Sequence, residues 1–166
     1  SDDAFFLRRF NAWGFGIWRD RFERIRYVSP DEYKAFAANK RRVTDFVEAG
    51  GEDMLTMLAL DVHGKIDGLD VKAMYAQFLS DQYTLYPRRS LTRNVGMDGT
   101  GLHSARTDKF EVSLSSCESF VLPDDVRIDP RIVAANQVFR KGPGFWLRQL
   151  HNVSRMKRRL LGKHRA

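Results

Sequence analysis

The chain has 166 residues, of which 43% are hydrophobic, so it is long enough for one compact domain with its own core. Its single cysteine, Cys117, excludes an intramolecular disulfide framework, and no run of about twenty apolar residues is present to span a bilayer. The net charge is +7, but residues 141–166 hold eight Lys or Arg and no acid, so the preceding part sums to −1.

The predicted elements are mostly helices. In chain order they are helices over 15–27, 30–38, 40–48, 52–62 and 70–79, short strands over 82–86 and 110–114, and helices over 130–140 and 145–161. Ser29-Pro30 supplies an N-cap and a proline at the first helical position of the second helix. The segment 52–62 is apolar nearly all round, which implies burial. These elements predict an α/β fold that is predominantly helical.

Residues 94–103 read Asn-Val-Gly-Met-Asp-Gly-Thr-Gly-Leu-His, with three glycines, an Asp and a His in ten positions. Glycines cost backbone entropy on folding and are useful where the chain needs unusual dihedrals or a close approach to another group. The segment therefore has two readings: a ligand-contacting loop, or a surface turn with an exposed histidine.

Five short motifs occur in a fixed order. They are Ala-Trp-Gly-Phe-Gly-Ile-Trp (12–18), Gly-Gly-Glu-Asp-Met-Leu (50–55), Gly-Lys-Ile-Asp (64–67), Tyr-Thr-Leu-Tyr-Pro (83–87) and the glycine loop (94–103). In this order and spacing the motifs resemble the C-terminal half of bacterial family-two glycosyltransferases that build cell-surface polysaccharides. The resemblance covers about residues 5–110. Each motif is short, but five in register are more specific than one.

The resemblance implies the acceptor-side part of a GT-A-type fold, the fold of enzymes that transfer a sugar from a nucleotide-diphospho-sugar donor. The N-terminal nucleotide-binding half, with its Asp-X-Asp metal motif, is expected to be missing, because an apolar run begins at Ala4 before any Met. We expect residues 1–116 to be the C-terminal part of the catalytic domain and 117–166 to be a helical extension with a basic amphipathic tail. The isolated fragment is expected to be inactive.

Glycosyl transfer needs a carboxylate that accepts the acceptor's hydroxyl proton and a cation that neutralises the departing diphosphate. Asp53, beside Glu52, is the predicted general base, and Gly50 and Gly51 would let the backbone approach substrate. Acids near a helix N-terminus are also commonly caps or dipole partners, and sequence patterning alone favours that structural role. The resemblance reverses the preference, since such enzymes often place an acidic pair here with the second carboxylate as base.

His103 is the candidate metal ligand, because an imidazole at the end of a glycine loop can complete a site whose carboxylates lie elsewhere. The resemblance implies a divalent metal, Mn or Mg, held mainly by the missing N-terminal half. It also implies that Asp53 and His103 face one saccharide cleft.

Besides Gly50 and Gly51, the predicted substrate contacts fall in three segments. They are Trp13, Gly14 and Trp18 of the aromatic segment, Arg88 and Arg89 after the predicted strand 82–86, and Asn94, Gly99 and Gly101 of the glycine loop. Aromatic faces stack on sugar rings but are also ordinary core material, and paired arginines can hold a diphosphate or remain solvated. Related enzymes usually show a second Trp where Phe15 stands.

The tail, 145–166, predicts a basic amphipathic helix that either lies on an anionic membrane or packs on the domain with a solvated basic face. The expected partners are a nucleotide-sugar donor and a saccharide or lipid-linked acceptor, in the cytoplasm or peripherally at the inner face of the plasma membrane. Nucleic acid is disfavoured, because the aromatic residues cluster away from the basic tail. The alternative function is a non-catalytic helical interaction or membrane-surface-binding domain.

Overall fold

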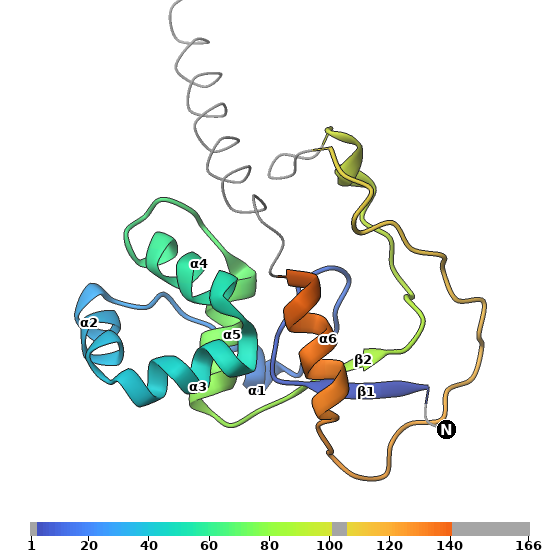
Figure 1. Ribbon diagram of the computed structural model, residues 1–166, viewed down its shortest axis with the longest axis horizontal. Helices are drawn as coiled ribbons and strands as arrows, with labels where there is room; N and C mark the ends of the chain where they lie inside the picture. The colour runs from blue at the N-terminus through green and yellow to red at the C-terminus, as the bar shows by residue number, and fades with distance from the viewer. Residues whose placement is uncertain (1–2, 101–105, 141–166) are drawn as a thin grey trace, which may run out of the picture. The chain divides into compact units, whose positions relative to one another are not determined.

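The computed structural model describes residues 3–100 and 106–140 (Figure 1). Contacts divide them into two units, the first made of residues 3–89 and 116–140 and the second of 90–100 and 106–115. We expected a boundary after residue 116. The chain returns to the first unit at this point, so residues 117–140 belong with residues 3–89. Within the described residues no helix has both the length and the apolar character needed to cross a bilayer.

The protein is a mixed α/β protein, predominantly helical, with a two-stranded sheet. The elements are β1 (Ala4–Leu7), α1 (Arg19–Phe22), α2 (Pro30–Ala38), α3 (Lys40–Gly50), α4 (Glu52–Val62), α5 (Leu69–Leu79), β2 (Thr84–Pro87), the 3-10 helix η1 (Val95–Asp98) and α6 (Pro130–Arg140). The predicted helices over 30–38, 40–48, 52–62, 70–79 and 130–140 are therefore confirmed. The helix predicted over 145–161 lies outside the described residues.

Two side-chain caps determine where α2 and α3 begin. The Ser29 hydroxyl accepts a hydrogen bond from the Glu32 amide at 3.2 Å, and the Asn39 amide oxygen accepts one from the Arg42 amide at 3.1 Å. Each cap satisfies a backbone donor that has no partner inside its helix. The break at Asn39 therefore both ends α2 and starts α3.

The core of the first unit lies among α2, α3, α4 and α5, which Figure 1 shows gathered together. Phe46, Leu58, Val71 and Met74 are completely buried there. The ring of Phe46 meets those of Phe36, Tyr75 and Phe78 edge to face, with centroids 5.2–6.1 Å apart. Burial of each such side chain contributes about 1.5–3 kcal/mol, so this cluster is the main stabilising feature of the unit.

The small sheet differs from expectation. The predicted strand over 82–86 is confirmed as β2, but it pairs antiparallel with β1, with Phe5 opposite Tyr86. The strand predicted over 110–114 is wrong, since Phe110 lies in a turn and residues 111–114 belong to no helix or strand. Alternation alone does not make a strand, because the backbone groups need a neighbouring strand to bond.

The helix predicted over 15–27 is also wrong, because only Arg19–Phe22 is helical. Trp18, the residue before this short helix, has an extended backbone with φ at −70° and ψ at 145°, and it is 79% exposed. An isolated helix of this length is marginal in water and needs a packed apolar face. Of the predicted apolar stripe, Phe15 packs edge to face on Phe10 and Ile25 lies against the core, whereas Trp18 and Phe22 are exposed.

Candidate functional site

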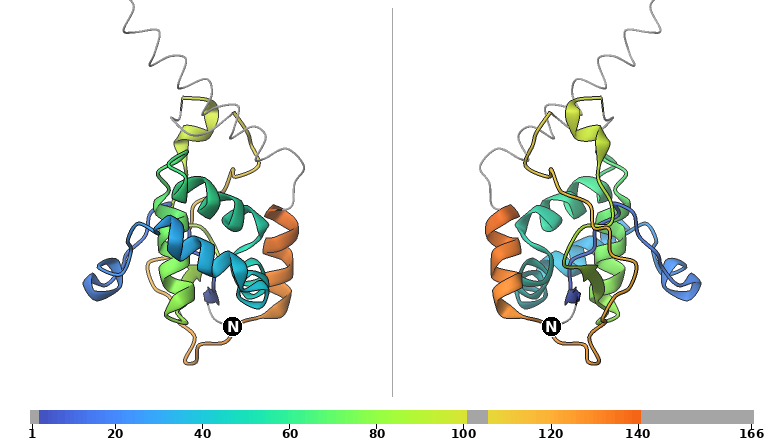
Figure 2. Two further views of the ribbon diagram at one scale, coloured as in Figure 1. Left: turned by 90° about the vertical axis from the view of Figure 1, so that its left-hand side faces the viewer. Right: turned by 90° about the vertical axis from the view of Figure 1, so that its right-hand side faces the viewer.

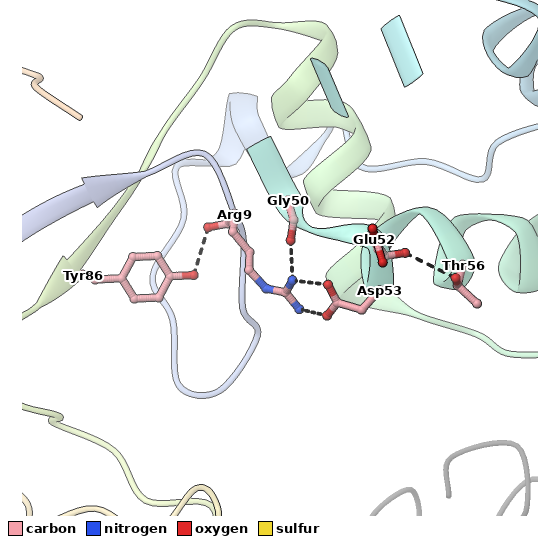
Figure 3. Close-up of polar contacts among 6 residues, drawn as sticks. All are labelled: Arg9, Gly50, Glu52, Asp53, Thr56 and Tyr86. Carbon is pink, nitrogen blue, oxygen red and sulfur yellow. Dashed lines mark hydrogen bonds and ion pairs between the residues drawn. The ribbon is translucent and has the colours of Figure 1, made fainter. Parts of the chain in front are cut away.

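A buried ion pair joins the start of the chain to the first turn of α4. Asp53 is 4% exposed, and its Oδ1 and Oδ2 lie 2.7 and 2.5 Å from Nη1 and Nη2 of Arg9. Nη1 also donates to the carbonyl of Gly50 (Figure 3). This is a bidentate arrangement, in which the planar guanidinium matches the carboxylate. Both oxygens of the predicted general base are therefore committed to Arg9.

Gly51 makes room for this pair. Its φ of +101° and ψ of 156° lie in a region open almost only to glycine. A Cβ at this position would lie 2.5 Å from Oδ1 of Asp53 and 3.2 Å from Nη1 of Arg9. The glycine pair was expected to admit substrate. In the structure, the space beside Gly51 holds the protein's own ion pair.

Glu52 lies beside Asp53 but in a different environment. Its side chain is exposed in the first turn of α4, and its backbone carbonyl accepts a hydrogen bond from the hydroxyl of Thr56 at 3.2 Å. Carboxylates near a helix N-terminus are favoured by the helix dipole. Of the two candidate catalytic carboxylates, Glu52 is the one that a solute reaches without displacing a protein group.

Arg9 also connects the Tyr-Thr-Leu-Tyr-Pro motif of β2 to this turn. The hydroxyl of Tyr86 donates to the carbonyl of Arg9 at 2.9 Å, as Figure 3 shows. Three residues further on, the amide of Ala12 donates to Oδ1 of Asp70 at 3.0 Å, which anchors the aromatic segment to α5. Three of the sequence motifs therefore meet around one arginine and its neighbours.

The electrostatics of this region are dominated by burial. Burial raises the pKa of Tyr86 to about 12 and also raises the pKa of Asp70, although the Ala12 amide opposes the second shift. Burial lowers the pKa of Arg140 to about 10, and the charge of Arg9 adds to that effect. The formal positive charges of Arg9 and Arg140 equal the formal negative charges of Asp53 and Asp70.

The predicted substrate contacts of the aromatic segment, Trp13, Gly14 and Trp18, differ in their exposure to solvent. Trp13 is half-buried, and its amide donates to the side-chain oxygen of Asn11 at 3.3 Å. Gly14 is exposed with φ at +65°. Trp18 is 79% exposed. Trp13 is therefore close in sequence and space to the anchor at Ala12, whereas Trp18 projects into solvent.

The remaining predicted contacts lie after β2. Arg88 and Arg89 have exposed side chains, and the Arg88 amide donates to the carbonyl of Asp3 at 2.8 Å. In the second unit, Asn94 caps η1 by accepting from the Gly96 amide at 2.9 Å, and Gly99 closes it with φ at +98°. Gly101 and His103 lie outside the described residues.

The second unit also has a shallow hollow of about 460 Å³. It is lined by Arg93, Glu111, Val112, Ser113 and Leu114, and Arg93 and Glu111 form an exposed ion pair at 3.7 Å across it. Over residues 3–100 and 106–140, no group of three or more His, Cys, Asp or Glu side chains is arranged around a common metal position.

Arg9, Tyr86 and Asp70 were missed as site residues. Arg9 follows the apolar run of β1, and a cation that enters the core needs an acidic partner. The sequence therefore indicated that Arg9 needs an acidic partner, but that partner, Asp53, lies 44 residues away, and only the folded structure identifies it.

Comparisons with models of known protein families, with curated proteins and with solved structures found no match.

Proposed function

We propose that this chain is the acceptor-side part of a GT-A-type glycosyltransferase. The proposed reaction is inverting, metal-assisted transfer of a sugar from a nucleotide-sugar donor to a saccharide or lipid-linked acceptor. Support comes from the order of the five motifs and from one structural observation: Arg9 binds Gly50 and Asp53 through its side chain and Tyr86 through its carbonyl, immediately before the aromatic segment. Residues that are distant in sequence thus converge on the turn that carries the acidic pair.

The environments of Glu52 and Asp53 suggest a division of roles. A general base must lie within hydrogen-bond reach of the proton that it accepts. Asp53 meets this condition only after Arg9 releases one carboxylate oxygen, whereas Glu52 is exposed and needs no such rearrangement. We therefore assign proton acceptance to Glu52, and we assign Asp53 with Arg9 to holding the turn that presents it.

The test compares three variants of the enzyme that includes the nucleotide-binding half. Glu52→Gln should lower kcat by about 10²–10⁴-fold, the usual contribution of a general base, with unchanged thermal stability. The pair variant Arg9→Met/Asp53→Leu removes both buried charges together and should keep measurable transfer. If Glu52→Gln transfers sugar normally and the pair variant folds but is inactive, the base is Asp53.

The proposed metal, Mn or Mg, would be held mainly by the nucleotide-binding half, with His103 as an additional ligand. It would neutralise the departing diphosphate. His103→Ala should raise the metal concentration needed for half-maximal transfer. An unchanged metal titration would remove His103 from the site.

A screen of nucleotide sugars tests the function itself. Transfer from one donor to a saccharide or lipid-linked acceptor is the expected result. The alternative is a non-catalytic interaction domain, and it would be favoured if the coding frame upstream lacked a strand-rich segment with an Asp-X-Asp motif.

A further inference from the structure

Residues 13–26, here called the aromatic arm, are anchored to the first unit at both ends. At one end the Ala12 amide donates to Oδ1 of Asp70 at 3.0 Å, and at the other the Tyr27 hydroxyl donates to the Val62 carbonyl at 2.9 Å. Between these anchors the backbone hydrogen bonds of 18–25 connect arm residues to one another. Figure 2 shows the arm, with α1, standing away from the other helices of its unit. The anchors therefore hold a projecting segment in place.

The projecting part presents aromatic side chains to solvent. Trp18, Phe22 and Phe15 are 79%, 51% and 38% exposed. A single exposed apolar side chain needs no explanation, but several large ones close together in one segment indicate a surface that is covered in use. Phe15 also packs edge to face on the buried ring of Phe10, and Ile25 lies against the core, so the exposed aromatic surface is centred on Trp18 and Phe22.

The same segment is basic. It carries four arginines against two acids, listed as Arg19, Arg21, Arg24 and Arg26 against Asp20 and Glu23. Arg26 forms an ion pair with Glu32 outside the arm, at 2.7 Å, so its charge is partly compensated. Arg21 likewise pairs with Asp20 inside the arm, with Nε 3.3 Å from Oδ2, and the side chains of Arg19, Arg21 and Arg24 are exposed in the same segment as the aromatic residues. A partner with negative charge and an apolar interior is complementary to this composition.

The size of the arm helps to decide among three classes of partner: a protein, a nucleic acid and a membrane. A standard protein interface takes about 20–30 residues a side, more than the arm contains. Tight nucleic-acid binding uses about 6–10 phosphate contacts, more than its arginines provide. An interfacial membrane anchor needs only a few aromatic side chains at the depth of the lipid headgroups, with cations beside them. The arm matches this last requirement.

We propose that the aromatic arm docks on an anionic lipid bilayer. Trp18 and Phe22 enter the headgroup region, and Arg19, Arg21 and Arg24 contact lipid phosphates. The inference does not depend on transferase activity, because binding to lipid is measured without donor or acceptor. It would place Trp13, next to the Ala12 anchor, near the surface that carries a lipid-linked acceptor.

The first test is cosedimentation of the chain with vesicles of phosphatidylcholine alone or with about one-third phosphatidylglycerol. The chain should bind the anionic vesicles, and Trp18→Ala/Phe22→Ala should lower the partition coefficient about tenfold or more, because two aromatic side chains no longer leave water. The matched control Phe120→Ala/Leu122→Ala removes two exposed apolar side chains elsewhere in the first unit and should bind normally. Equal binding to neutral and anionic vesicles, or normal binding by the arm variant, overturns the proposal.

The second test distinguishes the arm from the basic tail. The chain has three tryptophans, Trp13, Trp18 and Trp146, so Trp13→Phe/Trp146→Phe leaves Trp18 as the only one. Anionic vesicles with brominated acyl chains should shift its emission to the blue and quench it. If the vesicles bind this variant but its emission does not change, the tail or another segment carries the binding and the arm does not.

Discussion

The two neighbouring acids, Glu52 and Asp53, have the same functional group but different chemistry because of their surroundings. Glu52 is exposed, whereas Asp53 is buried with both oxygens on Arg9. Removing an ion from water costs free energy, and a bidentate partner with an additional acceptor on Gly50 offsets much of that cost. The pair is therefore sensitive to loss of one member and tolerant of loss of both.

Asp53→Asn should reduce the free energy of unfolding by about 3–5 kcal/mol, because it leaves the charge of Arg9 buried without its counterion. Urea denaturation followed by circular dichroism measures the change. The control Arg9→Met/Asp53→Leu should be within about 1 kcal/mol of the wild type, since no unpaired charge remains. If Asp53→Asn unfolds at the wild-type urea concentration, the buried pair is not a stabilising feature.

Tyr86 gives a prediction for alkaline pH. Burial raises the pKa of its phenol from 10.0 to about 12, so the native state keeps this proton at pH values where the unfolded chain loses it. The stability contributed by Tyr86 is complete below pH 10 and declines as pH rises toward 12. Spectrophotometric titration of phenolate absorbance should show late phases for Tyr75 and Tyr86, since burial raises the pKa of both, and the Tyr86 phase should lie near pH 12. That phase should be missing in Tyr86→Phe, and its persistence there would assign it to another tyrosine.

At the level of elements, the turn between α3 and α4 depends on glycine for two reasons: its positive φ and the space that the ion pair occupies. Gly64, after α4, shares the first reason only, since its φ is +63° and a Cβ there would meet no atom within 4 Å. An alanine at position 51 therefore introduces both backbone strain and a steric clash, whereas an alanine at position 64 introduces backbone strain alone.

Gly51→Ala should lower the free energy of unfolding by roughly 3 kcal/mol, whereas Gly64→Ala should cost about 1 kcal/mol, the left-handed penalty alone. Thermal or urea denaturation of both variants gives the comparison. Equal losses would mean that Arg9 and Asp53 move aside without cost, and the turn would not be built around them.

The predictions for individual elements succeeded where the signals were local. Ser29-Pro30 determined the start of α2, and Gly50-Gly51 marked the boundary between α3 and α4. They failed over 15–27, where Phe15 and Ile25 reach the core but Trp18 and Phe22 stay exposed. They also failed over 110–114, where the alternation was present but the residues belong to no strand. Strand β1 was missed because its pairing partner, β2, follows about eighty residues later.

At the level of the whole molecule, stability is concentrated in one helical cluster. Phe46, Leu58 and Met74 are buried in α3, α4 and α5, whereas residues 111–120 belong to no helix or strand. Within a protein, the free energy of local opening is high where side chains are well packed and low where they are not.

Hydrogen exchange measured by mass spectrometry should therefore be slowest in α3, α4 and α5 and fastest in 111–120. The expected contrast is several orders of magnitude in rate, because exchange in the cluster requires loss of the core and exchange in 111–120 does not. Protection of 111–120 equal to that of α4 would indicate that this segment pairs with a strand after all.

The sequence by itself determined the helical character of the chain, the limits of α2 to α6 and the location of the acidic pair, because caps, glycines and apolar spacing act over a few residues. Only the tertiary structure decided that Asp53 is paired and Glu52 exposed, that β1 joins β2, and that Trp18 and Phe22 of the aromatic arm stay exposed. Each of these depends on which distant residue becomes a neighbour, and that is a property of packing.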